Sequence, residues 1–551
     1  MARFGDDGRG RLRSRVERLL ASPRWRSALA VLAGALPALA FPAPSLWWFA
    51  YVALVPWMLL ARTAPTGRRA MLDGWLGGLG FMVAVHHWLL PSLHVFTLVI
   101  AALLGLLWAP WGWLVRRLLA GAPSPRRAAA ALVALPSGWL MVELVRSSEG
   151  LGGPWGLLGS SQWQLPPALR LASVGGVWLV SAVVVCVNTA LAQLAVAWAR
   201  RMPVGAGAAS RVPGRAASGP ALVGLVAVVA LSCAAGAWAP RPEPAGRVRV
   251  AVVQPGVIEG ASAPDRRLAR EEELTRSLAG RDPDLVVWGE SSVGVDLADR
   301  PDVARRIAAL SREVGADILV NVDARRSDRP GIFKSSVLVG PEGPTGDRYD
   351  KMRLVPFGEY IPARSLLGWA TSVGKAAGED RRRGDRQVVM DAGHGLRVGP
   401  LVCFESAFPD MSRRLTRDGA QLLLAQSATS SFQASWAPEQ HASLAAIRAA
   451  ETGRPMVHAT LTGVSAVHAP DGSRVGAPLG TSASAAAVYD VPLGRGVTAY
   501  VRWGDWPLRG ALVVLVALCA AEGARALRRP VPERRGPRAR TVHGSPAHPG
   551  R

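Results

Sequence analysis

Cysteine and lysine are both scarce in this chain of 551 residues, and each scarcity is informative. There are four cysteines; three lie in long apolar segments, and only Cys403 lies in the mixed region that follows them. That region therefore cannot form an internal disulfide, and its single thiol is either buried and inert or used chemically. Lysine and arginine together number 64, yet only Lys334, Lys351 and Lys375 are lysines. Arginine would serve equally well for surface charge, so a retained lysine such as Lys351 indicates a task for a compact ammonium group.

The composition excludes a wholly soluble enzyme of ordinary kind. Half of the residues are hydrophobic, 20 are tryptophan, and the mean hydropathy is +0.19. The formal net charge of +24 would suggest a nucleic-acid partner if it lay on one folded face. The arginines instead gather in short clusters between apolar segments, which is typical of a membrane protein, and we expect no nucleic-acid binding.

Eight apolar segments are candidates to span a bilayer, seven before the mixed region and one after it, and several are near the lower length limit. Alternate connections between them are basic, as are both ends of the chain, whereas the other connections are nearly free of lysine and arginine. The positive-inside rule then places both termini in the cytoplasm and the mixed region outside it. The segments are residues 27–42, 45–61, 71–90, 93–115, 128–145, 173–199, 219–239 and 508–527.

This pattern predicts five parts along the chain. They are a basic cytoplasmic N-terminus (1–26), a seven-helix transmembrane domain (27–239), an extracytoplasmic domain (246–500), a last transmembrane helix (508–527) and a basic cytoplasmic tail (528–551). An alternative is that the run from Ser27 to Ala40 is a cleaved signal peptide. A second apolar segment follows almost at once, and loss of the first span would leave the domain on the wrong side, so we favour the spanning interpretation.

The mixed region alternates short runs rich in Val, Ile and Leu with longer helical patterns, which predicts one layered α/β domain. Its length is sufficient for a substantial core. The expected strands are residues 248–254, 284–290, 317–323, 335–340, 397–405, 421–426, 455–460 and 464–469, and the expected helices are 264–280, 301–314, 410–418 and 438–452.

Three ionisable residues of this domain lie where a side chain would emerge near a strand end: Glu290, Lys351 and Cys403. A carboxylate, an ammonium and a thiol together suit acyl transfer, in which the carboxylate removes the thiol proton and the ammonium stabilises the oxyanion. Spacing alone leaves other interpretations open. Cys403 could be a small core residue, Glu290 a surface carboxylate, and Lys351 an ion-pair partner of a neighbouring acid.

The segments around these residues carry a family resemblance. RYDKMRLVPFGEYIP contains Lys351, LVCFE contains Cys403, VVWGES contains Glu290, and RAAETGRP spans 448–455. They resemble segments of the nitrilase, or carbon-nitrogen hydrolase, superfamily, which implies an αββα sandwich. With seven spans before the domain and one after, nearly the whole chain is similar to the apolipoprotein N-acyltransferase family.

The resemblance also implies roles for individual residues. Glu290 corresponds to the general base, Lys351 to the oxyanion-stabilising lysine and Cys403 to the nucleophile. Glu359 and Glu405 resemble accessory carboxylates that orient Lys351 or the incoming amine. The Phe404 N–H is expected to assist Lys351 at the oxyanion.

The function implied is transfer of an acyl chain from a membrane phospholipid, through a Cys403 thioester, to the α-amine of a lipoprotein's N-terminal diacylglyceryl-cysteine. Because a thioester is reactive toward amines, we expect no cofactor and no metal. We expect a monomeric, multi-pass protein of the bacterial cell membrane. The alternatives are a membrane-anchored amidase of the same superfamily, in which water resolves the acyl-enzyme, and a catalytically idle scaffold or transporter.

In the membrane region, VELVRSSEGLGGPWGLLGSSQ (142–162) resembles the family's span and outer loop. Glu143 and Arg146 lie at helical spacing and Trp155 is expected at the interface, so all three are substrate-binding candidates, although the two charges could equally form a simple ion pair. The histidines of VHHWLLPSLHVFT (85–97) lack a nearby acidic ligand, which disfavours a metal site.

Two departures from the family pattern stand out. Gly289 replaces the proline that commonly precedes the base, and residues 427–432, Ser-Ala-Thr-Ser-Ser-Phe, replace a segment that usually carries Asn-Asp and an aromatic pair. Because that loop borders the site in relatives, acceptor choice could differ, as in a specialised paralogue.

Overall fold

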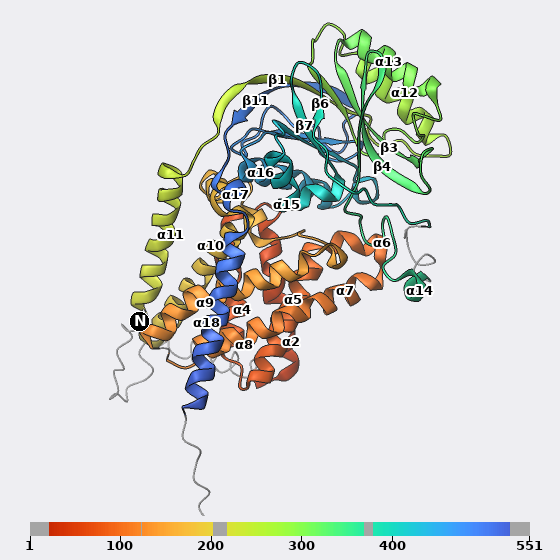
Figure 1. Ribbon diagram of the computed structural model, residues 1–551. Helices are drawn as coiled ribbons and strands as arrows, with labels where there is room; N and C mark the ends of the chain where they lie inside the picture. Colours follow the sequence, from red (N-terminus) through yellow and green to blue (C-terminus); the bar gives the residue numbers. More distant parts are fainter. Residues whose placement is uncertain (1–20, 123, 202–217, 369–377, 529–551) are drawn as a thin grey trace, which may run out of the picture.

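The computed structural model describes residues 21–122, 124–201, 218–368 and 378–528. Most of the basic N-terminus (1–26), nearly all of the basic tail (528–551) and Lys375 lie outside the described residues. The described chain has a helical part and a part built on two β-sheets (Figure 1). The sheets lie at one end of the helical part, and α18 ends at the opposite end (Figure 1).

All eight expected apolar segments contain helix. By length and composition, five helical stretches among the described residues could cross a membrane, or six if Gly67–Val85 and His87–Leu93, bent by 63°, form one broken span. The first two segments are short: α2 gives way to a 3₁₀ turn after Ala35, and Trp47–Arg62 is an apolar helix of fewer than 18 residues. The main helices are α2 (Pro23–Ala35), α4 (Val55–Arg62), α5 (Gly67–Val85), α7 (Val95–Gly105), α8 (Ala109–Leu119), α9 (Pro125–Arg146), α10 (Pro166–Arg201), α11 (Ser218–Trp238) and α18 (Trp506–Leu527).

Tryptophan fills the centre of the helical part. Trp57, Trp108, Trp111 and Trp139 are almost completely buried and contact one another through tilted and edge-on ring pairs. Helices α5 and α8 approach closely where glycines face each other, since a Cβ on Gly112 would lie 2.4 Å from a backbone oxygen of α5. Small residues allow this packing of helices whose outer surfaces are apolar.

The second part contains a six-stranded and a five-stranded sheet. Their strand orders are β11-β1-β2-β3-β4-β5 and β10-β9-β8-β7-β6. β1, β2 and β3 are mutually parallel, as are β7, β8 and β9. The strands are β1 (Glu243–Gln254), β2 (Leu285–Trp288), β3 (Asp317–Arg325), β4 (Ile332–Gly340), β5 (Gly343–Asp350), β6 (Met390–Asp391), β7 (Arg397–Val402), β8 (Leu422–Ser427), β9 (Met456–Thr460), β10 (Ala466–His468) and β11 (Ala485–Arg495).

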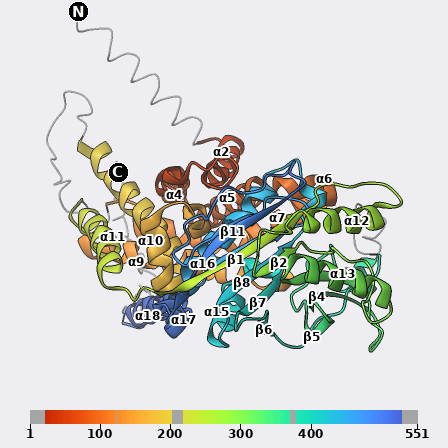
Figure 2. The same ribbon diagram turned by 90° about the horizontal axis from the view of Figure 1, so that it is seen from above.

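Helices cover the outer face of each sheet, which gives the expected αββα sandwich (Figure 2). One apolar core joins the two sheets and includes Val252 and Leu424. A second core joins the first sheet to α12 (Ala263–Arg276) and α13 (Pro301–Val314). A third joins the other sheet to α15 (Pro409–Arg417) and α16 (Ala437–Thr452), which lie on the side of the helical part (Figure 1).

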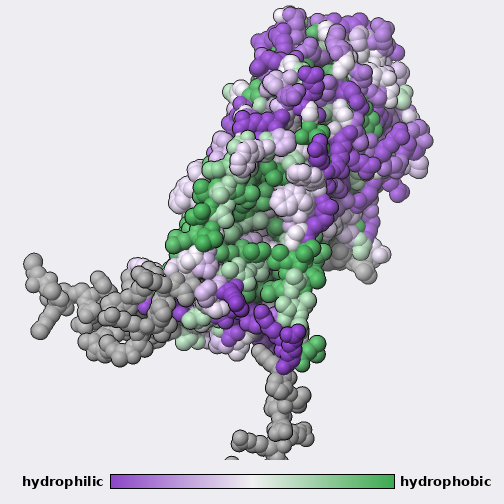
Figure 3. All heavy atoms as spheres, turned by 60° about the vertical axis from the view of Figure 1, so that its left-hand side comes forward, coloured by the Kyte–Doolittle hydropathy of each residue, from purple (hydrophilic) through white to green (hydrophobic). Residues whose placement is uncertain are grey.

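The surface supports placement of the helical part in a membrane. On the face drawn in Figure 3, hydrophobic residues gather over the helical part and hydrophilic residues cover the sheet part. Large apolar side chains are exposed on α11 and α18, among them Val223, Val226, Val513 and Val516. A water-soluble surface rarely carries such continuous apolar faces, so this is a membrane protein with a polar α/β domain.

Candidate active site

Glu290, Lys351 and Cys403 come from three distant parts of the chain and meet at one end of the sandwich. Glu290 follows β2, Lys351 directly follows β5, and Cys403 directly follows β7. The Lys351 Nζ lies 3.2 Å from Glu290 Oε1, and the Cys403 thiol is close enough to both groups for the Glu290 carboxylate to raise its pKa and the Lys351 ammonium to lower it. The structure therefore brings together the three residues that the sequence singled out.

Cys403 occupies a sharp turn between a strand and a helix. β7 ends at Val402, earlier than the expected strand 397–405, because Cys403 has a φ of +52° and opens a 3₁₀ turn. A positive φ is costly for a residue with a side chain, and such strain clusters at functional sites. The Cys403 carbonyl accepts from Ser406 Oγ at 2.8 Å and lies 3.1 Å from His441 Nε2, which holds the turn in place.

The charges in the site keep one proton on the Cys403–Glu290 pair. Burial alone would raise the pKa of the Glu290 carboxyl, but the ammonium groups of Lys334 and Lys351 outweigh it and lower that pKa to about 2. Burial, with the neighbouring Glu290 carboxylate, raises the pKa of the Cys403 thiol to about 12. Over the range between these values the pair holds a single proton that can move between sulfur and carboxylate.

The accessory carboxylates have different positions. Glu359 Oε1 accepts from Lys351 Nζ at 2.7 Å, and its Oε2 accepts from the Val355 amide at 2.8 Å, so it directly orients the lysine. Glu405 is completely buried; its Oε1 accepts from Tyr349 Oη and from the amides of Met352 and Arg353. It fixes the backbone that follows Lys351 and the side chain of Tyr349 two residues before it, and its burial leaves no surface for contact with an incoming amine.

Sequence reasoning missed two residues of this site. Lys334 Nζ lies 2.8 Å from Glu290 Oε1, closer than Lys351 does. His441, on α16, is buried, and burial lowers its pKa to about 4, so it is a neutral partner of the Cys403 turn. The scarcity of lysine was a signal for Lys334, whereas His441 had no distinguishing motif of its own.

The segment that contains Glu290 fits tightly between the two sheets. The Glu290 amide donates to the Ser427 carbonyl at 3.2 Å, which ties Glu290 to the first residue of the 427–432 loop that differs from the family pattern. A Cβ on Gly289 would lie 1.9 Å from the Leu461 nitrogen, so no side chain fits there. The replacement of proline by Gly289 thus accompanies an unusually close approach of two backbones.

The loop after α9 connects the helical part to the site. Glu143 Oε1 accepts from the Leu158 amide at 2.7 Å, and Arg146 donates to the carbonyls of Trp155 and Gly156, both at 2.6 Å. Both charged residues are buried and hold this loop, and among the ion pairs of the described residues none joins the two to each other. Their expected contact with substrate stays a prediction.

Trp155 lies beside the turn that begins at Cys403. Its Nε1 donates to Gln440 Oε1 at 2.8 Å, and its ring centroid lies 5.2 Å from that of His441. Phe404 is buried and contacts the same loop, because a Cβ on Gly153 would lie 2.6 Å from the Phe404 ring. The loop from the helical part therefore packs directly against the residues around Cys403.

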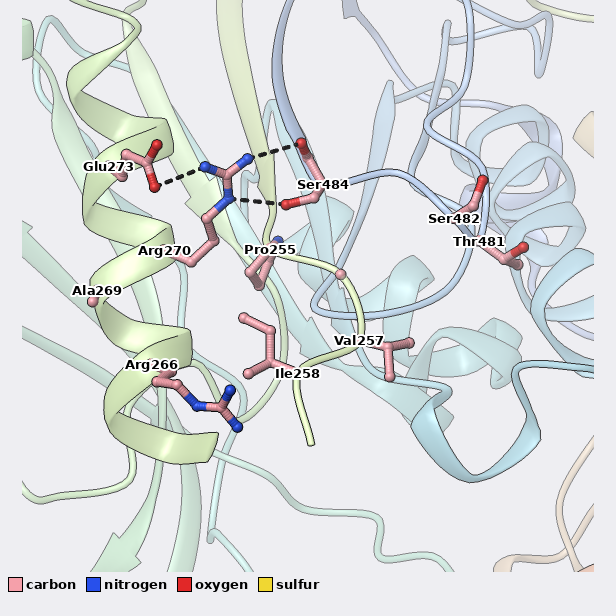
Figure 4. A pocket seen from close by; sticks show the side chains of 11 residues that line it. Pro255, Val257, Ile258, Arg266, Ala269, Arg270, Glu273, Thr481, Ser482 and Ser484 are labelled. Carbon is pink, nitrogen blue, oxygen red and sulfur yellow. Dashed lines mark hydrogen bonds and ion pairs between the residues drawn. The ribbon is translucent and has the colours of Figure 1, made fainter. Parts of the chain in front are cut away.

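The described part of the chain lacks a cluster of metal-ligating side chains, and one of its surface grooves lies away from this site. It contains no group of three or more His, Cys, Asp or Glu side chains that could hold a metal ion. A surface groove of about 690 Å³ lies between α12 and the segment before β11 (Figure 4). There Arg270 contacts Glu273 and Ser484, and none of the lining residues is Glu290, Lys351 or Cys403.

Comparison with known proteins agrees with this geometry. Residues 33–190 match the model of the apolipoprotein N-acyltransferase N-terminal domain, and residues 249–498 match that of the carbon-nitrogen hydrolases. An apolipoprotein N-acyltransferase of Geobacter metallireducens is 31% identical over 522 residues, covering 90% of this chain and 96% of that protein. One of Azotobacter vinelandii is 31% identical over 517 residues, with 91% and 96% covered.

Solved structures show weaker likeness. An amidase of the nitrilase superfamily from Nesterenkonia AN1 matches 46% of this chain and 93% of its own length, with 20% identity and a TM-score of 0.33. A CN-hydrolase superfamily protein of Xanthomonas campestris matches 49% and 97%, with 20% identity and a TM-score of 0.35. The fold assignment rests on the two helix-covered sheets and on the matching family model. The chain therefore belongs to the apolipoprotein N-acyltransferase family and is an acyltransferase with a carbon-nitrogen hydrolase domain.

Proposed function

We propose that this enzyme transfers an acyl chain from a membrane phospholipid to the α-amine of a lipoprotein's N-terminal diacylglyceryl-cysteine. The observation that carries the proposal is the convergence of Cys403, Glu290 and Lys351 beside a loop of the helical part. Both substrates carry acyl chains held in a bilayer, so a site packed against membrane helices can reach them without extracting them.

In the first half-reaction, Glu290 takes the proton of the Cys403 thiol and the thiolate attacks the carbonyl carbon of the phospholipid ester. Lys351 and the Phe404 N–H stabilise the oxyanion of the tetrahedral intermediate. The intermediate collapses with loss of the lysophospholipid alkoxide, which receives the proton from Glu290. A thioester at Cys403 and a free lysophospholipid result.

In the second half-reaction, the α-amine attacks the thioester carbonyl and Glu290 accepts the amine proton. The carbon-sulfur bond breaks, an amide forms, and the proton returns to the Cys403 sulfur. Glu359 keeps Lys351 in place through both steps, while Glu405 fixes the backbone around it. We assign Trp155 a substrate-contacting role, because it lies between the helical part and the turn that begins at Cys403.

For the arrangement in the cell, we propose both termini in the cytoplasm, seven spans in residues 27–239, an extracytoplasmic domain in 246–500 and a last span in 508–527. The alternation of basic connections along the chain supports this topology. The position of the sheets at one end of the helical part, with α18 ending at the other, is consistent with it (Figure 1). The enzyme is proposed to act as a monomer.

The test is mass spectrometry of purified protein incubated with a defined phospholipid. We expect the mass of one acyl chain to appear on the peptide that contains Cys403, and to disappear when a synthetic diacylglyceryl-cysteine peptide is added, with the amide product formed. Cys403→Ala is the control and should show no acyl mass while keeping the wild-type melting curve. Absence of the adduct in wild type would contradict the proposal, and discharge by water alone would favour the amidase alternative.

A further inference from the structure

Two of the three lysines of the chain lie directly opposite each other in the catalytic domain. The register of the β4–β5 pair joins Ser335 to Asp350, and the Lys351 amide donates to the Lys334 carbonyl at 2.8 Å. Like charges at opposite positions of an antiparallel pair repel and normally weaken a sheet. Both ammonium groups are also largely removed from solvent, since the side chains of Lys334 and Lys351 are 13% and 0% exposed. Such a pair is retained only where something compensates both charges.

The compensation comes from two carboxylates that alternate with the lysines. Lys334 Nζ lies 2.8 Å from Glu290 Oε1 and 3.3 Å from Glu359 Oε1. Lys351 Nζ lies 3.2 Å from the same Glu290 oxygen and 2.7 Å from the same Glu359 oxygen. Lys351 is therefore closer to Glu359, and Lys334 is closer to Glu290. The shorter of the two Lys334 contacts is therefore made with Glu290, the carboxylate that we propose receives the Cys403 proton.

We propose that Lys334 is a positioning residue that keeps Glu290 ionised, so that activation of Cys403 persists when the medium around the domain becomes acidic. The proposal rests on the proposed function in one respect, namely the location of the domain outside the cytoplasm. There the pH follows the surroundings, whereas a cytoplasmic site would be buffered by the cell.

The physical argument concerns the single proton shared by Cys403 and Glu290. Between the two macroscopic pKa values of the pair, the fraction present as thiolate and neutral carboxyl does not change with pH. Below the lower value a second proton binds, Glu290 is neutral, and the thiol has no base. The Lys334 ammonium lowers the pKa of Glu290 and so extends the working range toward acid.

The charged groups around Glu290 together set the pH range in which it stays ionised. Lys334 comes from β4, Lys351 from the end of β5 and Cys403 from the end of β7, and His441 approaches from α16 as a neutral imidazole. Glu359 shares both lysines, while Asp323 on β3 lies 3.7 Å from Lys334 and pairs with Arg381 at 3.2 Å. Lys334 makes the shortest ion-pair contact to Glu290, so its removal is expected to have the largest effect on that carboxylate.

The test measures alkylation of Cys403 by iodoacetamide in the full-length protein across about pH 4 to about pH 8. In this reaction the sulfur displaces iodide from carbon and its proton passes to Glu290 and then to solvent, so no acyl donor is needed. We expect the wild-type rate to stay nearly constant over this range. In Lys334→Met the rate should fall about tenfold per pH unit below a new, higher pKa of Glu290. At about pH 8 Glu290 is ionised in both proteins, so their rates should differ far less there than at acid pH.

Three controls make the result specific. Cys403→Ala gives the background from the other cysteines, Lys334→Arg keeps the positive charge and should restore the wild-type profile, and Arg325→Met removes an exposed cation at the end of β3 and should leave the profile unchanged. A Lys334→Met profile parallel to wild type at all pH values, whether lowered or not, would overturn the proposal. Failure of Lys334→Arg to restore the acid range would also overturn it. Because alkylation requires neither phospholipid nor lipoprotein, this outcome is independent of the test of the proposed function.

Discussion

At the scale of single residues, the site contains two lysines that contact the same two carboxylates but differ in their exposure to solvent. Lys351 is fully enclosed between Glu290 and Glu359, whereas the Lys334 side chain keeps some exposure. Both carboxylates hold the pKa of Lys351 above its ordinary value although burial opposes its charge. A permanently charged, compact ammonium at this position suits stabilisation of an oxyanion that forms next to Cys403.

The enclosure of Lys351 predicts that arginine cannot replace it. The guanidinium of Lys351→Arg is larger and planar, and it would have to displace Glu359 or Glu290 in a site with no spare exposed surface. We expect the rate of acyl-enzyme formation at Cys403 to fall by about 100-fold or more, measured by mass spectrometry with phospholipid. Lys334→Arg is the matched control and should lose far less. Equal rates for Lys351→Arg and wild type would show that a compact ammonium is not required.

The sequence was sufficient to predict which three residues converge, because each lies in a segment that resembles the family, although only Glu290 and Cys403 lie at the end of an expected strand. It was insufficient for Lys334, since its role depends on the register of β4 and β5. β5 was not predicted, as its sequence GPTGDRYD lacks the apolar alternation that indicates a strand. His441 was missed because its contact with Cys403 depends on the packing of α16 against the second sheet.

At the scale of secondary structure, the catalytic geometry depends on how closely the two sheets approach. β2 leads into Gly289 and Glu290, and β9 leads into Leu461, whose amide donates to the Ser427 carbonyl that also holds Glu290. Strand β11, which pairs with β1 along its full length, was not predicted because proline and small residues interrupt its pattern. The sheet order is thus set by long-range pairing that local periodicity does not reveal.

The close approach at Gly289 predicts a strong effect from the smallest possible side chain. In Gly289→Ala the new Cβ would meet backbone atoms of Thr460 and Leu461, so β2 and β9 must separate and Glu290 must move away from Cys403. We expect acyl-enzyme formation to slow by about tenfold or more, because small displacements of catalytic groups are costly. Gly294→Ala, where a Cβ would meet nothing within 4 Å, is the control and should behave like wild type. Unchanged acylation in Gly289→Ala would show that the approach of the two sheets does not position Glu290.

At the scale of the whole molecule, α16 joins the catalytic domain to the membrane helices. Its first turns carry Gln440 and His441 beside Trp155, and its last turn carries Glu451, which accepts from the Val177 amide of α10 at 2.7 Å. That amide lies next to the break in α10 at Gly175 and Gly176. The sequence predicted both the helix and the apolar segments, but the number of spans depends on bends and 3₁₀ turns that composition does not fix.

The buried Glu451 predicts how the stability of this junction depends on pH. Burial raises its pKa from an ordinary value of 4.5 to about 7, although Arg448 Nη2 donates to Glu451 Oε1 at 3.0 Å and opposes the rise. The folded state therefore binds this proton more tightly than the unfolded state, so the group favours folding below about pH 4.5, and this contribution is lost as the pH rises to about 7. In Glu451→Gln this pH dependence should disappear, while Glu439→Gln, at an exposed position of the same helix, should retain it. The measurement is the melting temperature of detergent-solubilised protein at about pH 5 and at about pH 8. We subtract the melting temperature at about pH 8 from that at about pH 5, and we expect this difference to be more positive in wild type than in Glu451→Gln. An equal difference in the two proteins would contradict a titrating carboxyl at this junction.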